Sequence, residues 1–471
     1  MRDRGTVWMV CVCATVVACS VMMSNAGPLD PPVGPVEPTF TTLDEVDPST
    51  PLDGAYVTGD ASAVFIIKQP GAYHLVRDIV GDNGMSGVRI EASGVTIDMR
   101  GYNLVGSSMS GDGIVASPDT TEPDNERRAG IVVKGHGRIE GWDGWGIDLS
   151  LADRSRVEDV IVSGCRSGGI TMGSGAQVRR VASEANEGTN ISCLDGAILE
   201  ACSAHASVNG DGIRVRSGAV IEKCTASDNA GSGVVCEDGS VLDRCVAQRN
   251  GGDGIRGNNR VVCRSSSASG NAANGIALND HATVDACTST GNGMNGLLVR
   301  DNSTVRACTL SSNGTNGFDA GRTANVHACT AALNGEEGFR FDQECLVVEC
   351  FARGNTRDGF VAPEDGHFIG CYATRNQNGF VSLDFTVLEG CYASLHTQSS
   401  IIVGDLARVE NCTVMNSLGL DGNNRAILLQ GSRALAKNNH VVRADIGFEA
   451  IGALNGLSRP RALLRRHSRR W

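Results

Sequence analysis

The sequence predicts an all-β fold in which short strands stack in successive coils, and three columns of a 21-residue repeat indicate it. A strict period with fixed columns is typical of stacked, nearly identical structural units. The first column is cysteine, with Ser266 in its one gap. It comprises Cys202, Cys224, Cys245, Cys287, Cys308, Cys329, Cys350, Cys371, Cys391 and Cys412.

The second column is an asparagine five residues after each cysteine position, and the third is a glycine followed by an apolar residue. A buried asparagine column can pass amide hydrogen bonds from coil to coil. Glycine suits a bend that requires a positive φ, so we expect that conformation in the third column. The asparagines are Asn229, Asn250, Asn271, Asn292, Asn313, Asn334, Asn355 and Asn376, and the glycines include Gly254, Gly275, Gly296, Gly317 and Gly338.

The remaining apolar positions of each repeat come in pairs spaced by two, such as Ile276 and Leu278. This is the period of a half-buried strand. One repeat therefore holds three short strands joined by tight turns, as in a coil of a parallel β-helix, with equivalent residues about 4.8 Å apart. We count about 13 clear coils between Val160 and Cys412. The general preference of parallel crossovers favours a right-handed path.

Two other repeat folds have related periods. Leucine-rich repeats need the pattern L-x-x-L-x-L-x-x-N, which this sequence lacks. Left-handed hexapeptide helices repeat in multiples of six, which a period of 21 does not fit. The right-handed parallel β-helix is therefore the fold that we predict.

Coils such as CTASDNAGSGV and CVAQRNGGDGI resemble those of secreted right-handed parallel β-helix proteins, the pectate-lyase-like and NosD-like superfamily. The resemblance covers about Gly87 to Ala450. Members include polysaccharide lyases, glycoside hydrolases, alginate epimerases and periplasmic proteins, so the resemblance implies an exported protein that meets polysaccharide. The subfamily cannot be assigned, and no catalytic signature maps onto this chain, so the catalytic residues stay unknown.

The N-terminus is typical of an export signal. Arg2 and Arg4 precede an apolar run at 7–23, and Ser24-Asn25-Ala26 forms a cleavage site. The segment ending at Cys19 is similar to a lipoprotein box, but the apolar residues after it argue against lipidation. We expect a signal peptide at 1–26, a Pro-rich linker at 27–54, an N-terminal cap and first coils at 55–116, a polar loop at 117–128, β-helix repeats at 129–451 and a basic, disordered tail at 452–471.

Composition excludes some functions. The net charge is −12, and the only strongly basic segment is the tail, so nucleic-acid binding is not expected. No segment of the mature chain is long and apolar enough to span a bilayer.

Fifteen cysteines follow the signal. In-register neighbours hold their Cβ atoms about 4.8 Å apart, beyond the ~3.8 Å of a disulfide, so we expect mostly buried free thiols.

Three acids, Glu200, Glu222 and Asp243, share one outward column on consecutive coils. Like charges one coil apart repel unless something compensates them. A cation such as Ca²⁺ takes carboxylate oxygens readily, and a spacing of about 5 Å also suits the carboxyl pair of a retaining glycosidase. The alternative is a solvated acidic face with basic neighbours. No other cofactor is indicated.

An outward aromatic column, Phe351, Tyr372 and Tyr392, is typical of a platform for sugar rings. Arg214 and Arg256 follow the glycine column and are candidates for gripping uronate carboxylates. The alternatives are an aromatic column covered by a loop or by the C-terminal segment, and scattered surface arginines.

The sequence therefore predicts an exported β-helix protein, located in the periplasm, at the cell surface or outside the cell, that binds an extracellular polysaccharide. Cleavage or epimerisation of that polymer stays open, because fold does not fix function. If the protein is an enzyme, we expect a polysaccharide lyase, an epimerase or a glycoside hydrolase. The alternative is a non-catalytic structural or adhesive protein of the cell envelope. The oligomeric state is not determined by the sequence.

Overall fold

The computed structural model describes residues 49–117, 127–417, 424–451, 456–458 and 461–463. Every regular element in these residues is a β-strand. The predicted signal peptide and all but the last residues of the predicted linker lie outside the described residues, as does most of the predicted polar loop. No helix among the described residues has the length and hydropathy to cross a membrane.

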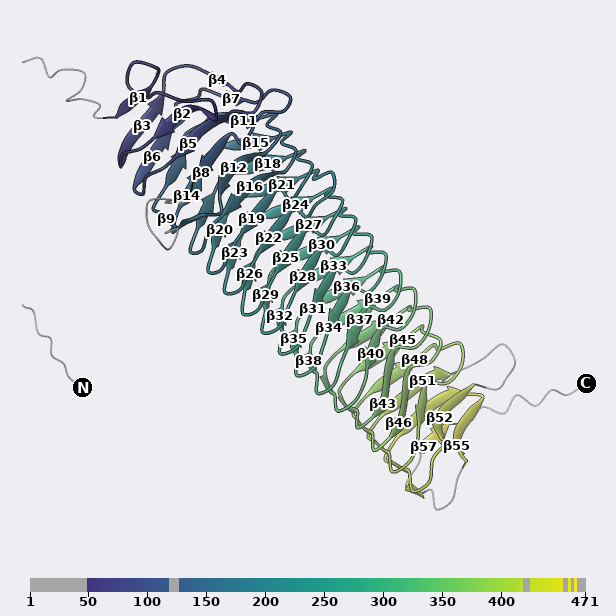
Figure 1. The fold of residues 1–471 in the computed structure, drawn as a ribbon. Coiled ribbons are helices and arrows are strands. Elements are labelled where there is room, and N and C mark those ends of the chain that lie inside the picture. Colours follow the sequence, from purple (N-terminus) through teal and green to yellow (C-terminus); the bar gives the residue numbers. More distant parts are fainter. Residues whose placement is uncertain (1–48, 118–126, 418–423, 452–455, 459–460, 464–471) are drawn as a thin grey trace, which may run out of the picture. The chain divides into compact units, whose positions relative to one another are not determined.

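Three parallel sheets, here called A, B and C, run along the stack of coils, and each coil passes through them in the order A, C, B (Figure 1). Within the described residues, sheet A has 19 strands. They are β1 (Thr50–Leu52), β3 (Gly71–Leu75), β6 (Val95–Asp98), β10 (Val132–Lys134), β14 (Arg156–Glu158), β17 (Gln177–Arg179), β20 (Ile198–Glu200), β23 (Val220–Glu222), β26 (Val241–Asp243), β29 (Val262–Arg264), β32 (Thr283–Asp285), β35 (Thr304–Arg306), β38 (Asn325–His327), β41 (Leu346–Val348), β44 (His367–Ile369), β47 (Val387–Glu389), β50 (Arg408–Glu410), β53 (Leu435–Lys437) and β56 (Gly456–Ser458).

Sheet C follows sheet A in each coil. Its strands are β4 (Ile79–Val80), β7 (Leu104–Val105), β11 (Arg138–Glu140), β15 (Ile161–Ser163), β18 (Ala182–Glu184), β21 (Ser203–His205), β24 (Thr225–Ser227), β27 (Val246–Gln248), β30 (Ser267–Ser269), β33 (Thr288–Thr290), β36 (Thr309–Ser311), β39 (Thr330–Ala332), β42 (Phe351–Arg353), β45 (Tyr372–Thr374), β48 (Tyr392–Ser394), β51 (Thr413–Ser417), β54 (His440–Ala444) and β57 (Arg461–Leu463).

Sheet B closes each coil. Its strands are β2 (Ala63–Ile67), β5 (Ser86–Ile90), β8 (Ile114–Ala116), β12 (Trp145–Leu149), β16 (Gly168–Met172), β19 (Ile191–Cys193), β22 (Ile213–Val215), β25 (Val234–Cys236), β28 (Ile255–Gly257), β31 (Ile276–Leu278), β34 (Leu297–Val299), β37 (Phe318–Ala320), β40 (Phe339–Phe341), β43 (Phe360–Glu364), β46 (Phe380–Asp384), β49 (Ile401–Val403), β52 (Arg425–Leu429) and β55 (Ile446–Ala450). A separate pair joins β9 (Arg128–Ala129) to β13 (Ala152–Asp153).

The described part of the chain forms about 18 coils, more than the 13 that the sequence makes clear. The additional coils have irregular lengths, which hide their period. Tyr73 pairs with Ile97, 24 residues on, and Ile97 pairs with Val133, 36 residues on. Strand β1 already pairs with β3, so sheet A begins inside the segment that we assigned to the linker. Likewise, β56 and β57 pair with β53 and β54 inside the segment assigned to a disordered tail.

The interior is filled by stacked columns of like side chains. Sheet B contributes two inward columns, and in its later coils one of them consists of phenylalanine. Phe339 and Phe360 stack with ring centroids 4.9 Å apart and planes within 5°, as do Phe360 and Phe380. Sheet C contributes a column of small residues, mostly alanine, such as Ala331 and Ala352. Large side chains on one wall thus face small ones on another, as close packing requires.

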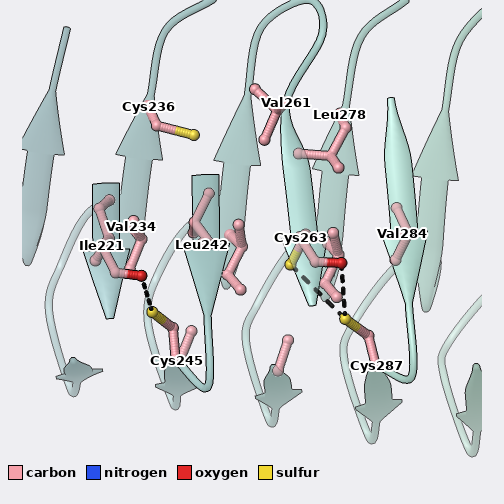
Figure 2. Close-up of a cluster of buried hydrophobic side chains, with 14 of the residues drawn as sticks. Ile221, Val234, Cys236, Leu242, Cys245, Val261, Cys263, Leu278, Val284 and Cys287 are labelled. Carbon is pink, nitrogen blue, oxygen red and sulfur yellow. Dashed lines mark hydrogen bonds between the residues drawn. The ribbon is translucent and has the colours of Figure 1, made fainter. Parts of the chain in front are cut away.

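The fifteen cysteines of the described residues are free thiols and are all buried, as predicted. Figure 2 shows thiols of the main column pointing inward, with Cys245 Sγ 3.4 Å from the Ile221 carbonyl oxygen and Cys287 Sγ 3.8 Å from Cys263 Sγ. Burial raises the pKa of the Cys245 thiol to about 11, so this thiol stays protonated and unreactive at neutral pH.

The cysteine column also serves the backbone at the turn between sheets A and C. The Cys308 N–H points at Cys329 Sγ of the next coil, at 3.4 Å. Ser266 fills the gap in the column and accepts the Cys245 N–H in the same way, at 3.1 Å. A small side chain with an acceptor atom is therefore what this position requires, because the N–H is buried.

The predicted asparagine ladder is present at the turn between sheets C and B. The backbone N–H and the Nδ2 of Asn292 both donate to Oδ1 of Asn313, at 3.1 and 3.0 Å. Asn313 repeats this arrangement toward Asn334 at 3.0 Å for both donors. The ladder links consecutive coils from Asn229 as far as Asn376. At its end the Asn376 N–H donates to Nδ1 of His396, at 3.3 Å.

The expectation of a positive φ at the glycine column is wrong, because glycines such as Gly296 and Gly317 are not among the positive-φ residues. A different constraint applies. A Cβ on Gly296 would lie 2.5 Å from Asn313 Nδ2 and 2.7 Å from the Gly317 carbonyl oxygen. Glycine is needed here because the asparagine of the next coil approaches the backbone closely.

Positive φ instead marks the residue before each cysteine and each asparagine of the repeat. Ala307 and Ser312, which precede Cys308 and Asn313, have φ of 50° and 56°. These left-handed residues turn the chain from one sheet into the next. Side chains other than glycine pay a steric penalty there.

We expect Ala307→Gly to raise the free energy of unfolding by about 1 kcal/mol, because glycine adopts the left-handed conformation without that penalty. Urea unfolding followed by circular dichroism would measure the change. Ala332→Gly is the matched control. Ala332 ends strand β39 without a positive φ, so glycine there should destabilise. Two changes of the same sign would contradict the prediction.

Candidate functional site

The outer faces of the three sheets carry the predicted site residues. Strands of sheets A and C generally direct their first and third residues outward, whereas strands of sheet B direct their middle residue outward. Sheets A and C therefore each display two columns, and sheet B displays one. The position of a residue within the repeat therefore determines the sheet on which its side chain lies and whether that side chain points outward.

The acidic column lies on the outer face of sheet A. Glu200 pairs in register with Glu222, and Glu222 with Asp243. Basic side chains neighbour two of the three acids. Lys223 Nζ is 3.7 Å from a Glu200 carboxylate oxygen, and Arg244 Nη2 is 2.7 Å from Asp243 Oδ2. Among the described residues there is no group of three His, Cys, Asp or Glu side chains placed to hold a metal ion. Calcium binding and glycosidase chemistry at this column stay untested predictions.

The aromatic column forms a continuous row on the outer face of sheet C. Phe351 pairs in register with Tyr372, and Tyr372 with Tyr392. The ring centroids are 6.5 Å apart in the first pair and 5.7 Å in the second. Tyr372 is 50% exposed, so a large part of its surface meets solvent. The Tyr392 hydroxyl contacts Met415 Sδ at 3.5 Å.

Two exposed arginines stand beside this row. Arg353 ends strand β42, and Arg375 follows strand β45 on the next coil. Within the described residues, neither guanidinium has an ion-pair or hydrogen-bond partner. Sequence reasoning missed both arginines, although the repeat places them next to the aromatic column. In the described part of the chain, their guanidinium N–H donors are therefore free beside the aromatic row.

The same face of sheet C continues into an uncharged, hydroxyl-rich field. From β24 to β39, no outward residue of the six strands is ionisable. Thr290 Oγ1 and Ser311 Oγ lie 3.1 Å apart on adjacent coils of this field. The outward residues are Thr225, Ser227, Val246, Gln248, Ser267, Ser269, Thr288, Thr290, Thr309, Ser311, Thr330 and Ala332.

The two predicted arginines lie on sheet B, away from the aromatic row, and have different surroundings. They share the outward column, with Val235 between them. Arg214 Nη2 lies 2.5 Å from Asp211 Oδ2, so its guanidinium is already paired. Arg256 has no such partner among the described residues, although Asp253 precedes it by the same three positions. Oδ1 of Asp253 accepts two hydrogen bonds from Asn274, at 3.0 and 2.9 Å.

Arg256 lines a pocket of about 250 Å³ on the outer face of β28, β31 and β34. Arg300, two coils further on, lines its other side. The small outward residue between these coils is Ala277, in register with Arg256 and Leu298. The lining residues are Asp253, Arg256, Gly257, Asn258, Asn274, Ala277, Leu278, Asn279, Leu298 and Arg300.

Residues 129–262 match the sequence model of a protein family described as "Right handed beta helix region". The fold is a right-handed parallel β-helix. The match covers the part of this β-helix in which the coils become regular. A comparison with curated proteins gives no match.

Several solved structures are similar to this β-helix at low identity. The periplasmic alginate epimerase AlgG is 10% identical over 87% of this chain and 82% of that chain, with a TM-score of 0.31. The A-module of a mannuronan C-5 epimerase of Azotobacter vinelandii is 11% identical over 82% of this chain and 91% of that chain, with a TM-score of 0.26. The tailspike of E. coli bacteriophage HK620, in complex with a pentasaccharide, is 11% identical over 81% of this chain and 72% of that chain, with a TM-score of 0.33. Similarity at this level carries no argument about what this chain does.

Proposed function

We propose that the protein binds an extracellular polysaccharide along the outer face of sheet C, with sugar rings stacked on Phe351, Tyr372 and Tyr392. The in-register aromatic row, in which Tyr372 is half exposed and the other two rings are partly exposed, supports this proposal. Exposed aromatic rings in one line leave apolar surface in water, which is typical of a binding surface. A sugar ring has apolar C–H faces that can cover such rings, while its hydroxyls stay in contact with solvent or polar groups.

The neighbouring side chains suit the hydroxyl groups of the polymer. Arg353 and Arg375 have donors without partners in the described chain, and Ser and Thr hydroxyls extend the surface toward β24. Equivalent side chains of successive coils repeat along the stack at the strand spacing of about 4.8 Å. A linear polymer lying across the strands, along the stack of coils, therefore meets equivalent positions one after another.

The signal peptide that the sequence predicts at 1–26 supports export, and hence an encounter with polymers outside the cytoplasm. We assign binding and no catalytic step. The reason is the regularity of the coils, since Val157 pairs with Val178 and the period then stays near 21 residues as far as Val409. Enzymes on this fold usually interrupt their coils with loops that build a cleft, and uniform coils favour the adhesive or structural version of the function.

We expect Tyr372→Ala to weaken binding to the preferred glycan by at least about tenfold, because the central ring of the row is lost. A glycan array with the whole chain would find the ligand, and calorimetry would measure the affinity. Phe385→Ala is the matched control, since Phe385 is 55% exposed and lies off sheet C. Failure to bind any glycan, or equal losses in the two variants, would refute the proposal.

A further inference from the structure

The pocket on sheet B holds two guanidinium groups that have no partner in the described chain. About half of the arginines in the described residues have an ion-pair partner, as Arg214 has in Asp211 and Arg340 has in Asp319. Arg256 and Arg300 form no ion pair or side-chain hydrogen bond among the described residues. Both side chains are exposed and line one cavity. Unpaired cations that share a cavity repel each other and attract an anion.

The pocket has a definite floor and polar walls. Ala277 lies in register between Arg256 and Leu298, and its small side chain leaves the space that the cavity occupies. The amide side chains of Asn258 and Asn279 are exposed at the wall. The volume of about 250 Å³ is just below the range of ordinary small-molecule pockets, so one compact group fits.

The charges of the lining favour a single negative charge. Two arginines and one carboxylate, that of Asp253, give the pocket a net charge of +1. Asp253 Oδ1 accepts hydrogen bonds from the backbone and side-chain amides of Asn274, which hold this carboxylate against the next coil. A ligand with one negative charge therefore balances the net charge of the pocket. A ligand with two negative charges would leave one of them uncompensated beside the Asp253 carboxylate.

We propose that this pocket binds the oxyanion of a small, singly charged acidic ligand, gripped between Arg256 and Arg300. Guanidinium groups donate paired hydrogen bonds to the oxygens of such an anion. The ligand's apolar part lies over Ala277 and Leu298, and its neutral polar groups meet the asparagine amides. A carboxylate and a sulfate ester share this chemistry. The site is separate from the aromatic row and does not depend on the function proposed for it.

Three sugars that differ in one group test the pocket: glucuronate, glucose 6-sulfate and glucose. We expect the whole chain to bind one or both acids at millimolar concentration and not to bind glucose, measured by calorimetry or ligand NMR. Arg256→Gln and Arg300→Gln should each weaken binding at least about tenfold. Arg214→Gln is the matched control in the same column, and its effect should stay within about twofold because Asp211 already holds that side chain.

The two acids decide the source of the oxyanion. Binding of glucuronate alone identifies a carboxylate site, binding of the sulfate alone identifies a sulfate site, and binding of both identifies a general oxyanion site. The proposal is overturned if neither acid binds, if glucose binds equally well, or if the Arg214 and Arg256 variants behave alike. Loss of binding in Tyr372→Ala would also overturn it, by placing the ligand on sheet C instead.

Discussion

Replacing Asn313 with alanine is expected to lower the free energy of unfolding by about 3 kcal/mol. Its Oδ1 accepts two hydrogen bonds from Asn292, and its Nδ2 donates to Asn334 Oδ1 and to the Ser289 carbonyl oxygen. Asn292 and Asn313 are each only 2% exposed, so water cannot replace the lost acceptor for the Asn292 backbone N–H. A buried donor without a partner is costly.

Urea unfolding followed by circular dichroism would measure this loss. Asn325→Ala is the control, because Asn325 is exposed on the outer face of sheet A and should change stability by less than about 0.5 kcal/mol. Asn313→Ser should recover part of the loss, since Ser266 already accepts a backbone N–H from the preceding coil with its hydroxyl. An unfolding midpoint that does not move in Asn313→Ala would show that the ladder contributes no stability.

Acid is expected to destabilise the protein through His396, which occupies the position after the last asparagine of the ladder. This side chain is 2% exposed, and burial lowers its pKa from 6.5 to about 4. Its Nδ1 accepts the Asn376 N–H, and its Nε2 lies 3.2 Å from the Ala373 carbonyl oxygen. A proton on Nδ1 would place two donors against each other. The neutral ring is therefore the form that the fold holds.

The sign follows from the two pKa values. In the unfolded chain the histidine takes up a proton below about pH 6.5, whereas in the folded chain it does so only near pH 4. The stability from this group is thus full above pH 6.5 and falls as the pH drops from 6.5 to 4, by about 3 kcal/mol in total.

Unfolding curves at pH 7 and pH 4.5 would measure the loss in the wild type and in His396→Asn. The asparagine continues the ladder and does not titrate, so most of the acid sensitivity of this window should disappear. His281→Asn, at an exposed corner residue, should leave it unchanged. A pH dependence that is equal in wild type and His396→Asn would exclude this histidine as its source.

The repeat pattern alone was enough to predict the class of fold, the three strands of a coil, the buried thiols and the asparagine ladder. The reason is that each repeat contacts only its neighbours in the stack, and a residue's place in the period fixes both its sheet and its face. The same logic places Phe351, Tyr372 and Tyr392 in one row. Early coils escaped detection because their lengths vary, so the columns do not align in the sequence although the strands pair in space.

Features that depend on neighbours one coil away could be seen only in the folded protein. Gly296 is needed because Asn313 of the next coil approaches it, whereas the positive φ falls on Ala307 and Ser312. Arg214 and Arg256 have the same local pattern, an aspartate three residues earlier, but only the first is paired. Asp253 accepts two hydrogen bonds from Asn274 on the following coil, and Ala277 on that coil leaves space beside Arg256. The period of the sequence specifies the column in which a side chain lies. The partner of that side chain depends on the residues of the coils above and below it. This dependence explains why one surface arginine is paired while another lines a candidate ligand site.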